Sequence, residues 1–224
     1  MKITALLPMK GHSERVPNKN MKSFANKPLY HFVMQTLISS KYIDDIVVNT
    51  DSDIIKKDIK ENFDSVMIIN RPHAIIGDSV SMNKIIAYDL SQLEGKHFLQ
   101  THSTNPLLTP NTLDKAVEQY FNKLDTYDSL FSVTKVQTRL YWENGKPINH
   151  DPQELQRTQD LPPVFEENSN FYVFSRNSFE NAGERRIGTK AQMFEMDKLE
   201  AIDIDEPKDF ILAELLYKRT RGML

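Results

Sequence analysis

Hydrophobic residues along the first 135 positions follow two alternating spacings. Short apolar runs are typical of buried strands, whereas apolar residues three and four positions apart predict one buried face of a helix. The predicted strands are 3–7, 46–48, 66–69, 97–100 and 129–133, and the predicted helices are 29–38, 54–59, 82–90 and 113–121. Strands that alternate with helices predict βαβ units. We therefore expect an α/β fold, a Rossmann-like three-layer sandwich with a mostly parallel sheet and helices on both faces.

The regular pattern stops after Lys135. The segment at about 136–168 is rich in proline, asparagine and glutamine and contains the only tryptophan, Trp142. An irregular stretch of this length inside a compact domain is usually functional or forms an interface. We expect a small arm that protrudes from a single domain spanning residues 1–224.

Regular patterning returns near the C-terminal end. The segment FYVF at 171–174 predicts a strand, and AQMFEMD at 191–197 predicts another. A closing helix is expected at 207–217, with Pro207 in its first turn, where a missing N–H costs nothing.

Composition narrows the possible classes. Hydrophobic residues make up 39% of the 224 residues, which is enough for one sizeable core, and 28 basic against 31 acidic residues give a net charge of −3. A near-neutral chain lacks the basic excess of a nucleic-acid binder. The absence of cysteine excludes disulfides, thiolate metal sites and a cysteine nucleophile. No apolar run suits a signal peptide or a membrane span, so we expect a cytoplasmic protein without a membrane partner.

The loop after the first strand concentrates positive charge. It reads PMKGHSERVPNKN at 8–20, and Lys22 follows it. Ligands of parallel α/β sheets bind at the carboxyl ends of the strands, where this loop begins. The loop lacks the spaced glycines of the dinucleotide fingerprint and of the Walker A loop. Lysines and free backbone N–H groups suit a polyanion such as a triphosphate, and the alternative is a solvated basic loop.

The segment IDIDEPKDF at 202–210 contains an acidic pair. Asp203 and Asp205 fall on one side of an extended segment, because strand side chains repeat every two residues. Converging carboxylates beside isoleucines are costly unless a cation compensates them. Oxygen ligands suit Mg²⁺, which binds through one or two carboxylates plus substrate phosphates. The alternative is an acidic pair that only leads into a helix cap, and the basic loop favours the metal site.

The order of residues in the basic loop, P-x-[KR]-x-x-S-x-R-[VL]-P-x-K-N, resembles the first motif of the CMP-sugar synthetases. These cytidylyltransferases activate sialic acids and related nonulosonic acids. The family usually has arginine where this chain has Lys10, so the charge is kept but the bidentate fork is lost. The family also carries a D-x-D motif near its C-terminal end, as this chain does.

Two further segments resemble the family's nucleotide motifs. VVNTDSDII at 47–55 is similar to a motif after the second strand, and we assign Asp51 and Ser52 to helix capping. RPHAIIGDSVS at 71–81 resembles the stretch that recognises cytosine, where Met82 replaces a second serine of many relatives.

Other segments resemble the sugar-binding part. FLQTHSTNPLL at 98–108 resembles a shorter family loop in which Gln100 reaches ribose or sugar hydroxyls, and His102 is expected to be a hydrogen-bonded loop residue. RTQDLPPVFEENSNFYVFS at 157–175 resembles the region after a dimerisation arm, with Ser169 in place of a glycine. The arm implies a homodimer. The pair Arg185–Arg186 is expected on the solvated surface, with sugar or phosphate contact as the alternative.

The resemblance implies a Mg²⁺-dependent cytidylyltransferase that joins CTP to a 2-keto-3-deoxy sugar acid and releases pyrophosphate. The implied catalytic residues are Lys10, Lys19 and Asp205; the nucleotide-binding residues are Lys10, Gly11, Ser13, Arg15, Lys19, Asn20, Arg71 and Ser81; the sugar-binding residues are Gln100, Asn168, Tyr172 and, toward a partner subunit, Arg157; the metal ligands are Asp203 and Asp205. The alternatives are a D-x-D glycosyltransferase, a nucleotidyltransferase for another sugar, and an inactive nucleotide-binding relative.

Overall fold

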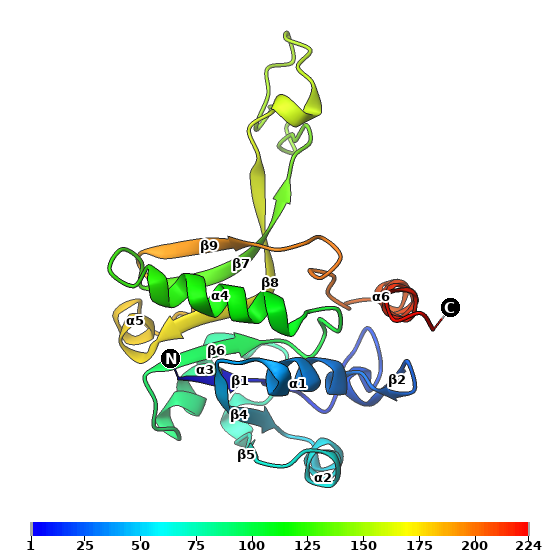
Figure 1. Cartoon of the computed structure of the whole chain (residues 1–224), viewed down its shortest axis with the longest axis vertical. Coiled ribbons are helices and arrows are strands. Elements are labelled where there is room, and N and C mark those ends of the chain that lie inside the picture. The colour runs from blue at the N-terminus through cyan, green and yellow to red at the C-terminus, as the bar shows by residue number, and fades with distance from the viewer. Residues whose placement is uncertain (1, 224) are drawn as a thin grey trace.

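The computed structural model describes residues 2–223 and contains a seven-stranded sheet in the order β5-β4-β1-β6-β8-β7-β9 (Figure 1). The strands are β1 (Ile3–Leu6), β4 (Ile43–Thr50), β5 (Val66–Asn70), β6 (His97–Thr101), β7 (Ser129–Val136), β8 (Val164–Ser175) and β9 (Ala191–Glu195). All neighbouring strands pair in parallel except β8, which is antiparallel to both β6 and β7. The predicted mostly parallel sheet is confirmed.

Six helices accompany the sheet within the described residues. They are α1 (Tyr30–Ser39), α2 (Asp53–Asn62), α3 (Met82–Ser91), α4 (Pro110–Asn122), α5 (Arg176–Asn181) and α6 (Pro207–Thr220). A two-stranded hairpin, β2 (Ser23–Phe24) and β3 (Lys27–Pro28), and short 3₁₀ turns at Lys19–Met21, His73–Ile75 and Thr158–Asp160 complete the elements. The sequence pattern missed α5, because six residues are too few to display a helical period.

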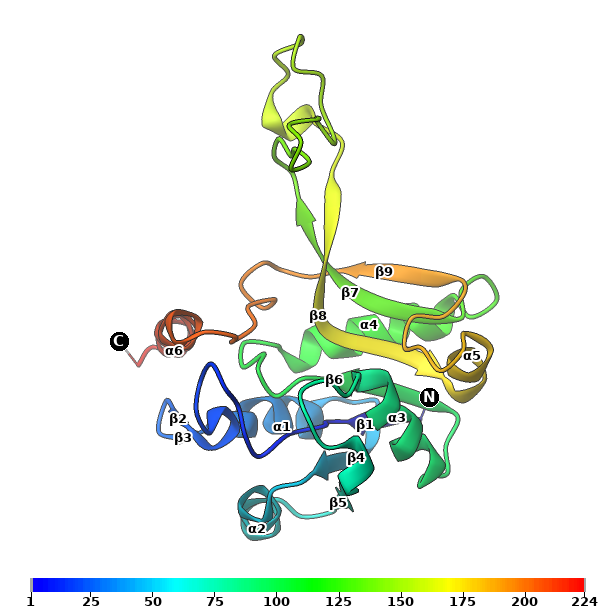
Figure 2. The same ribbon diagram turned by 180° about the vertical axis from the view of Figure 1, so that it is seen from behind.

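The sheet separates two hydrophobic cores. Side chains alternate along β1, so Ala5 packs with Val33 of α1 on one face, and Leu6 packs with Ile86 of α3 on the other. Helices α1 and α4 lie in front of the sheet in Figure 1, and α3 lies in front in Figure 2. Helix α5 contributes Phe179 to the α3 side. The expected three-layer arrangement with helices on both faces is therefore present.

A third cluster joins the two ends of the chain. Val16 from the loop after β1 and Phe24 of β2 are buried together with Ile204 and with Phe210 of α6. The rings of Phe24 and Phe210 lie edge to face, with centroids 5.5 Å apart. Burial of one such side chain stabilises the fold by about 1.5–3 kcal/mol. This packing fixes the acidic segment before α6 against the basic loop.

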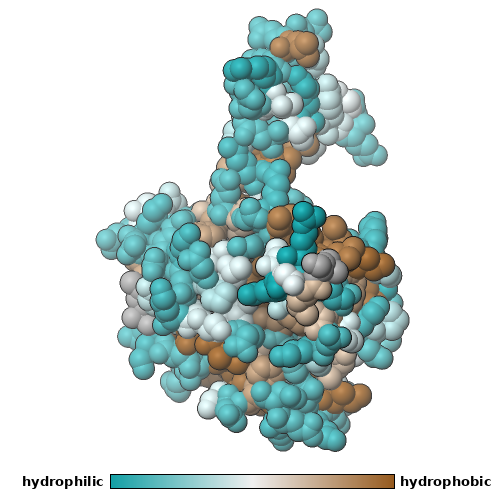
Figure 3. All heavy atoms as spheres, turned by 45° about the vertical axis from the view of Figure 1, so that its right-hand side comes forward, coloured by the Kyte–Doolittle hydropathy of each residue, from teal (hydrophilic) through white to brown (hydrophobic). Residues whose placement is uncertain are grey.

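An arm formed by the outer parts of β7 and β8 projects from the body (Figures 1 and 2). These strands remain paired from Val133↔Glu167 to Val136↔Val164 beyond an irregularity in the register. Asn149 ties the outer arm together, since it accepts from Leu140 N at 3.0 Å and donates to two carbonyl oxygens. Hydrophilic residues cover most of the arm in the view of Figure 3. None of the helices within residues 2–223 combines the length and apolar character that a membrane span requires.

Candidate active site

Four loops meet where β1, β4, β5 and β6 end, and we call this region the carboxyl edge; it comprises residues 7–22, 51–52, 71–81 and 102–105, together with Arg186, which reaches Gln100 near the end of β6. Strand β1 has β4 on one side and β6 on the other, so the strand order reverses there. In open α/β sheets such a reversal opens a crevice that binds ligands. The acidic segment before α6 also reaches this region.

The basic loop after β1 is held by side chains of neighbouring loops. Gly11 N donates to Asp51 Oδ1 at 2.7 Å, and Asn20 Nδ2 donates to the Lys10 carbonyl oxygen at 3.0 Å. Asn20 in turn accepts from Ser103 Oγ at 2.6 Å, and both Asn20 and Ser13 are buried. The loop is therefore a fixed structure at the carboxyl edge.

Capping of α2 corrects one prediction. Ser52 caps the helix, because its hydroxyl accepts from Ile55 N at 3.4 Å. Asp51 was predicted to share this role but binds the Gly11 N–H instead. A Cβ at Gly11 would lie 2.9 Å from Ser52 Cβ, so the close approach of the loop to α2 explains the glycine.

The cations of the basic loop pair with two different carboxylates. Lys10 forms an ion pair with Asp78, in the loop after β5, and its hydrogen bond lowers the pKa of that carboxyl. Arg15 Nη2 lies 2.9 Å from Asp205 Oδ1, and Lys19 Nζ lies 3.6 Å from the same oxygen. The predicted phosphate loop and the predicted metal ligands are therefore brought together.

The acidic segment alternates as predicted, although it is not a strand of the sheet. Ile204 is fully buried and its N–H donates to the Thr104 carbonyl oxygen at 2.9 Å, whereas Asp203 and Asp205 reach solvent. Desolvation by the surrounding protein raises the pKa of the Asp203 carboxyl, and repulsion from Asp205 acts in the same direction. This carboxyl lacks full compensation, so a bound cation would stabilise its ionised form.

The guanidinium of Arg71 makes three hydrogen bonds through two of its three nitrogens. Its Nε donates to Asn49 Oδ1 at 2.7 Å, and its Nη2 donates to the carbonyl oxygens of Met9 and Asn49. Nη1 makes no hydrogen bond within residues 2–223. Asn49 also donates to Asp89, whose burial raises the pKa of its carboxyl to about 7. The sequence analysis did not identify Asn49 and Asp89 as neighbours of Arg71. The available signal was that each is a polar residue at a position where the pattern of its element, the strand β4 for Asn49 and the helix α3 for Asp89, calls for an apolar one.

Gln100 and Tyr172 meet through a residue that was predicted to be solvated. Arg186 Nη1 donates to Gln100 Oε1 at 2.5 Å, and Arg186 Cζ lies 4.0 Å from the centre of the Tyr172 ring. The surface prediction holds for Arg185, which is exposed, and is wrong for Arg186. His102 Nε2 lies 3.3 Å from Gln100 Nε2, in agreement with a hydrogen-bonded loop residue.

Three other predicted site residues use their side chains in bonds within the protein. The Asn168 amide is engaged inside the sheet, where it bonds to Ser132 Oγ at 2.6 Å and to Thr134 Oγ1 at 2.9 Å. Arg157 pairs with Asp160 on the arm. Ser81 caps α3. The binding roles of these three residues stay predictions.

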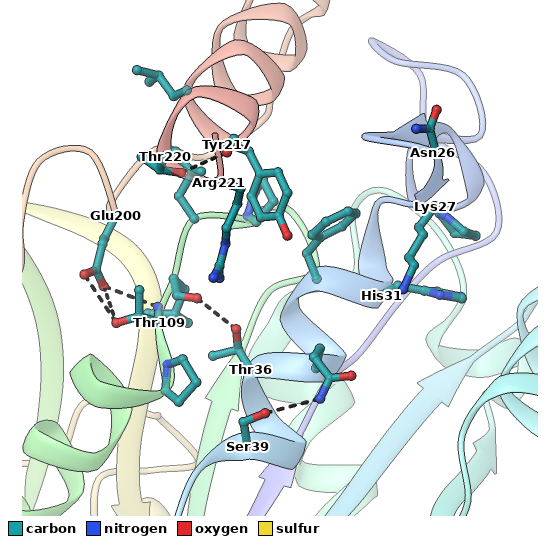
Figure 4. A pocket seen from close by; sticks show the side chains of 18 of the residues that line it. Asn26, Lys27, His31, Thr36, Ser39, Thr109, Glu200, Tyr217, Thr220 and Arg221 are labelled. Atoms are coloured by element: carbon teal, nitrogen blue, oxygen red, sulfur yellow. Dashed lines mark hydrogen bonds between the residues drawn. The ribbon is translucent and has the colours of Figure 1, made fainter. Parts of the chain in front are cut away.

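A cavity of about 860 Å³ lies elsewhere, between α1, α6 and the loop at 106–110 (Figure 4), and we call it the α1–α6 cavity. It is lined by none of the residues predicted to bind substrate. Many of its polar groups are paired: Thr36 Oγ1 donates to the Leu108 carbonyl oxygen at 2.8 Å, and Thr109 bonds to Glu200. The candidate chemistry therefore lies outside this cavity.

Comparisons with known proteins agree with the chemistry of the carboxyl edge. The chain is 29% identical over 220 residues to an N-acylneuraminate cytidylyltransferase of Oncorhynchus mykiss, a match that covers 95% of this chain and 49% of that protein. It is 25% identical over 230 residues to a pseudaminic acid cytidylyltransferase of Campylobacter jejuni, with 97% of both chains covered. The chain thus spans about half the length of the fish relatives and nearly the full length of the bacterial one.

Solved structures share the fold. A CMP:2-keto-3-deoxy-manno-octonic acid synthetase complexed with CTP superposes with a TM-score of 0.73 at 11% identity, covering 98% of this chain and all of that one. A 4-diphosphocytidyl-2C-methyl-D-erythritol synthase of Anaerococcus prevotii gives a TM-score of 0.68 at 13% identity, covering 97% of each chain. A sequence model of the cytidylyltransferases matches residues 4–221, and the chain therefore belongs to the cytidylyltransferase family that its motifs predicted.

Proposed function

We propose that this protein transfers CMP from CTP to a 2-keto-3-deoxy sugar acid, with release of pyrophosphate. The observation that carries the proposal is the contact between the basic loop and the acidic pair, in which Arg15 and Lys19 meet Asp205 at the carboxyl edge. Membership of the cytidylyltransferases supports the nucleotide, and relatives named for neuraminic, pseudaminic and legionaminic acids support the acceptor class.

The side chains of the carboxyl edge suit positioning and charge neutralisation, the main needs of nucleotidyl transfer. Lys10 and Lys19 bind triphosphate oxygens, and Arg15 supports them. Arg71 donates a hydrogen bond from its free Nη1 N–H to an acceptor atom of cytosine. The anomeric hydroxyl of the sugar acid attacks the α-phosphorus in line, the new P–O bond forms, and the bond to pyrophosphate breaks. The hydroxyl proton passes to solvent.

The acidic pair fits a magnesium ion. Asp203 and Asp205 lie on the same side of one segment, and the raised pKa of Asp203 indicates a carboxylate without full compensation. No group of three potential metal-binding side chains occurs within residues 2–223, and Mg²⁺ needs only one or two carboxylates when phosphates supply further oxygens. When bound, the ion would neutralise charge on the α-phosphate. When the triphosphate binds the cations of the basic loop, Asp205 would lose its ion pair with Arg15 and would bind the magnesium ion instead.

The arm supports a homodimer. Leu155 is 94% exposed and Trp142 is 59% exposed on the arm, so both offer apolar surface whose burial against another chain would be favourable. A second copy of the chain would cover them and would bring Arg157 toward the sugar of its partner. The expected cytoplasmic location and the absence of a nucleic-acid partner stay predictions.

A product assay tests the proposal. The protein is incubated with Mg²⁺, one nucleotide and each of a panel of 2-keto-3-deoxy sugar acids, and mass spectrometry detects the CMP-sugar while pyrophosphate is measured separately. We expect both products only when CTP and one of the acids are present. Better turnover with UTP or GTP would contradict the role of Arg71. Absence of product with every acid would contradict the proposed function.

A further inference from the structure

Arg186 is a partly buried cation without an anionic partner. It lies in the loop between α5 and β9, with its guanidinium over the Tyr172 ring and one N–H directed at Gln100. Both partners are neutral. None of the ion pairs within 4 Å among residues 2–223 includes Arg186.

Partial burial of the charged Arg186 guanidinium costs free energy in the protein without a ligand. Removal of water from the guanidinium lowers the pKa of Arg186, and the charge of Glu167, which counteracts this effect, belongs to a carboxylate that already accepts the Tyr172 hydroxyl. A guanidinium carries five N–H donors, and the hydrogen bond to Gln100 uses one of them. A charged group that is removed from water without a counter-ion is stabilised when an anion binds.

The loop that carries Arg186 is firmly anchored. Asp128 accepts from Thr189 N at 2.9 Å and from Lys190 N at 3.1 Å, and Gly188 N donates to Ser129 Oγ at 2.8 Å. A Cβ at Gly188 would lie 2.2 Å from Asp128 Oδ1, so the close approach requires glycine. A group held in this way is pre-organised for binding, because little ordering is left to do.

Arg186 belongs to the carboxyl edge but lies apart from the basic loop. Burial, together with the charges of Arg186 and Lys19, lowers the pKa of His102 to about 4, although the charge of Asp205 acts in the opposite direction. His102 is thus a neutral neighbour between these groups at pH 7. The basic loop supplies the cations for the triphosphate, whereas Arg186 contacts Gln100 and Tyr172, the residues predicted to bind the sugar.

We propose that Arg186 binds the carboxylate of the sugar-acid substrate. The proposal rests on the proposed function, since it names the residue that recognises the acid group of the acceptor. The planar fork of arginine matches a carboxylate with two parallel N–H···O bonds, and the Tyr172 ring holds the guanidinium plane. Arg186 is then a specificity residue that favours acidic sugars over neutral ones.

Steady-state kinetics with an acid and its methyl ester test this role. The esters keep the anomeric hydroxyl and remove the negative charge. The probes are the acids that give product in the panel above, each paired with its ester. The wild type should prefer the acid by about 10- to 100-fold in kcat/KM, as expected for charge-assisted hydrogen bonds. Arg186→Gln should abolish this preference and raise KM for the acid with little change in KM for CTP. Arg186→Lys keeps the charge and should show an intermediate preference.

Arg185→Gln is the matched control, because Arg185 is the exposed neighbour on the same loop, and it should behave as the wild type. Melting temperatures identify any variant that fails to fold, and Arg186→Lys then serves as the test. An equal loss for acid and ester in Arg186→Gln would overturn the proposal, and so would a rise in KM confined to CTP. Either result leaves the proposed function standing if the wild type forms product. A wild type that forms no product from any acid overturns both.

Discussion

The carboxyl edge and the α1–α6 cavity both gather polar side chains, but they differ in how the charges are compensated. In the cavity His31 shares the carboxylate of Asp58 with the buried Tyr30, and Thr109 binds Glu200. At the carboxyl edge Arg186 has only neutral partners and Asp203 has a raised pKa. The cavity provides space for a ligand, whereas the carboxyl edge provides charged groups that a ligand of opposite charge would neutralise.

The difference shows that volume alone is a poor guide to a polyanion site. Buried polar groups that bond to one another stabilise the fold and leave little to offer a ligand. Groups that carry unmatched charge favour binding of the opposite charge. Three substitutions can break or sharpen this contrast.

The largest effect is expected for Asp205→Asn. The variant keeps the shape of the side chain but removes a predicted metal ligand, so kcat should fall by about 10²–10³-fold, the usual loss when one group that stabilises the transition-state charge is removed. The melting temperature should change little, because the ion pair with Arg15 is solvent-exposed. Turnover close to that of the wild type would refute the metal assignment.

A smaller effect, on stability, is expected for Asp89→Asn beneath the carboxyl edge. The folded-state pKa of the Asp89 carboxyl, about 7, lies above its unfolded value of ~3.9, so the native state binds more protons than the unfolded state between these two pH values. Stability of the wild type should therefore fall as pH rises through this window, by about 1–4 kcal/mol, and stay level above it. The variant keeps an oxygen for Asn49 and should lose this pH dependence.

Chemical denaturation at a series of pH values measures the Asp89 effect as the difference between wild type and variant. Asp64→Asn is the control, because Asp64 is exposed. Identical pH profiles for wild type and Asp89→Asn would show that Asp89 stays ionised across the window.

The smallest effect is expected for Asp58→Asn in the α1–α6 cavity. This carboxylate accepts from Tyr30 and bonds to His31, so its replacement should lower the free energy of unfolding by about 1–2 kcal/mol. The kcat/KM for product formation should stay within about a factor of two, as for substitutions away from a functional site. A loss of activity as large as that of Asp205→Asn would make the cavity part of the active site and would end the contrast drawn above.

Much of the fold was predictable from local patterns. Strands and helices followed the apolar spacing because each buries one face, and Ser52 caps α2 as its type and position indicated. The antiparallel direction of β8 was not predictable from its apolar residues. It follows from the arm, which returns the chain directly beside β7, and a direct return joins antiparallel neighbours.

Part of the site was also predictable, whereas its internal contacts were not. The basic loop and the acidic pair could be read as two charged motifs, but their contact joins Arg15 and Asp205 across 190 positions. Arg186 looked like half of a solvated pair, because charge alone does not distinguish it from Arg185. The hydrogen bond to Gln100 and the contact with the Tyr172 ring distinguish Arg186 from Arg185.

The sequence by itself determined the element types, the family motifs and the kinds of charge available, since these depend on neighbours a few positions apart. Tertiary structure decided which charges meet and which are left without a partner. It placed Asp205 against the basic loop, Asp51 on Gly11, and Arg186 between Gln100 and Tyr172. The reason is physical, because the cost of an unpaired charge depends on burial and on atoms brought together by distant parts of the chain.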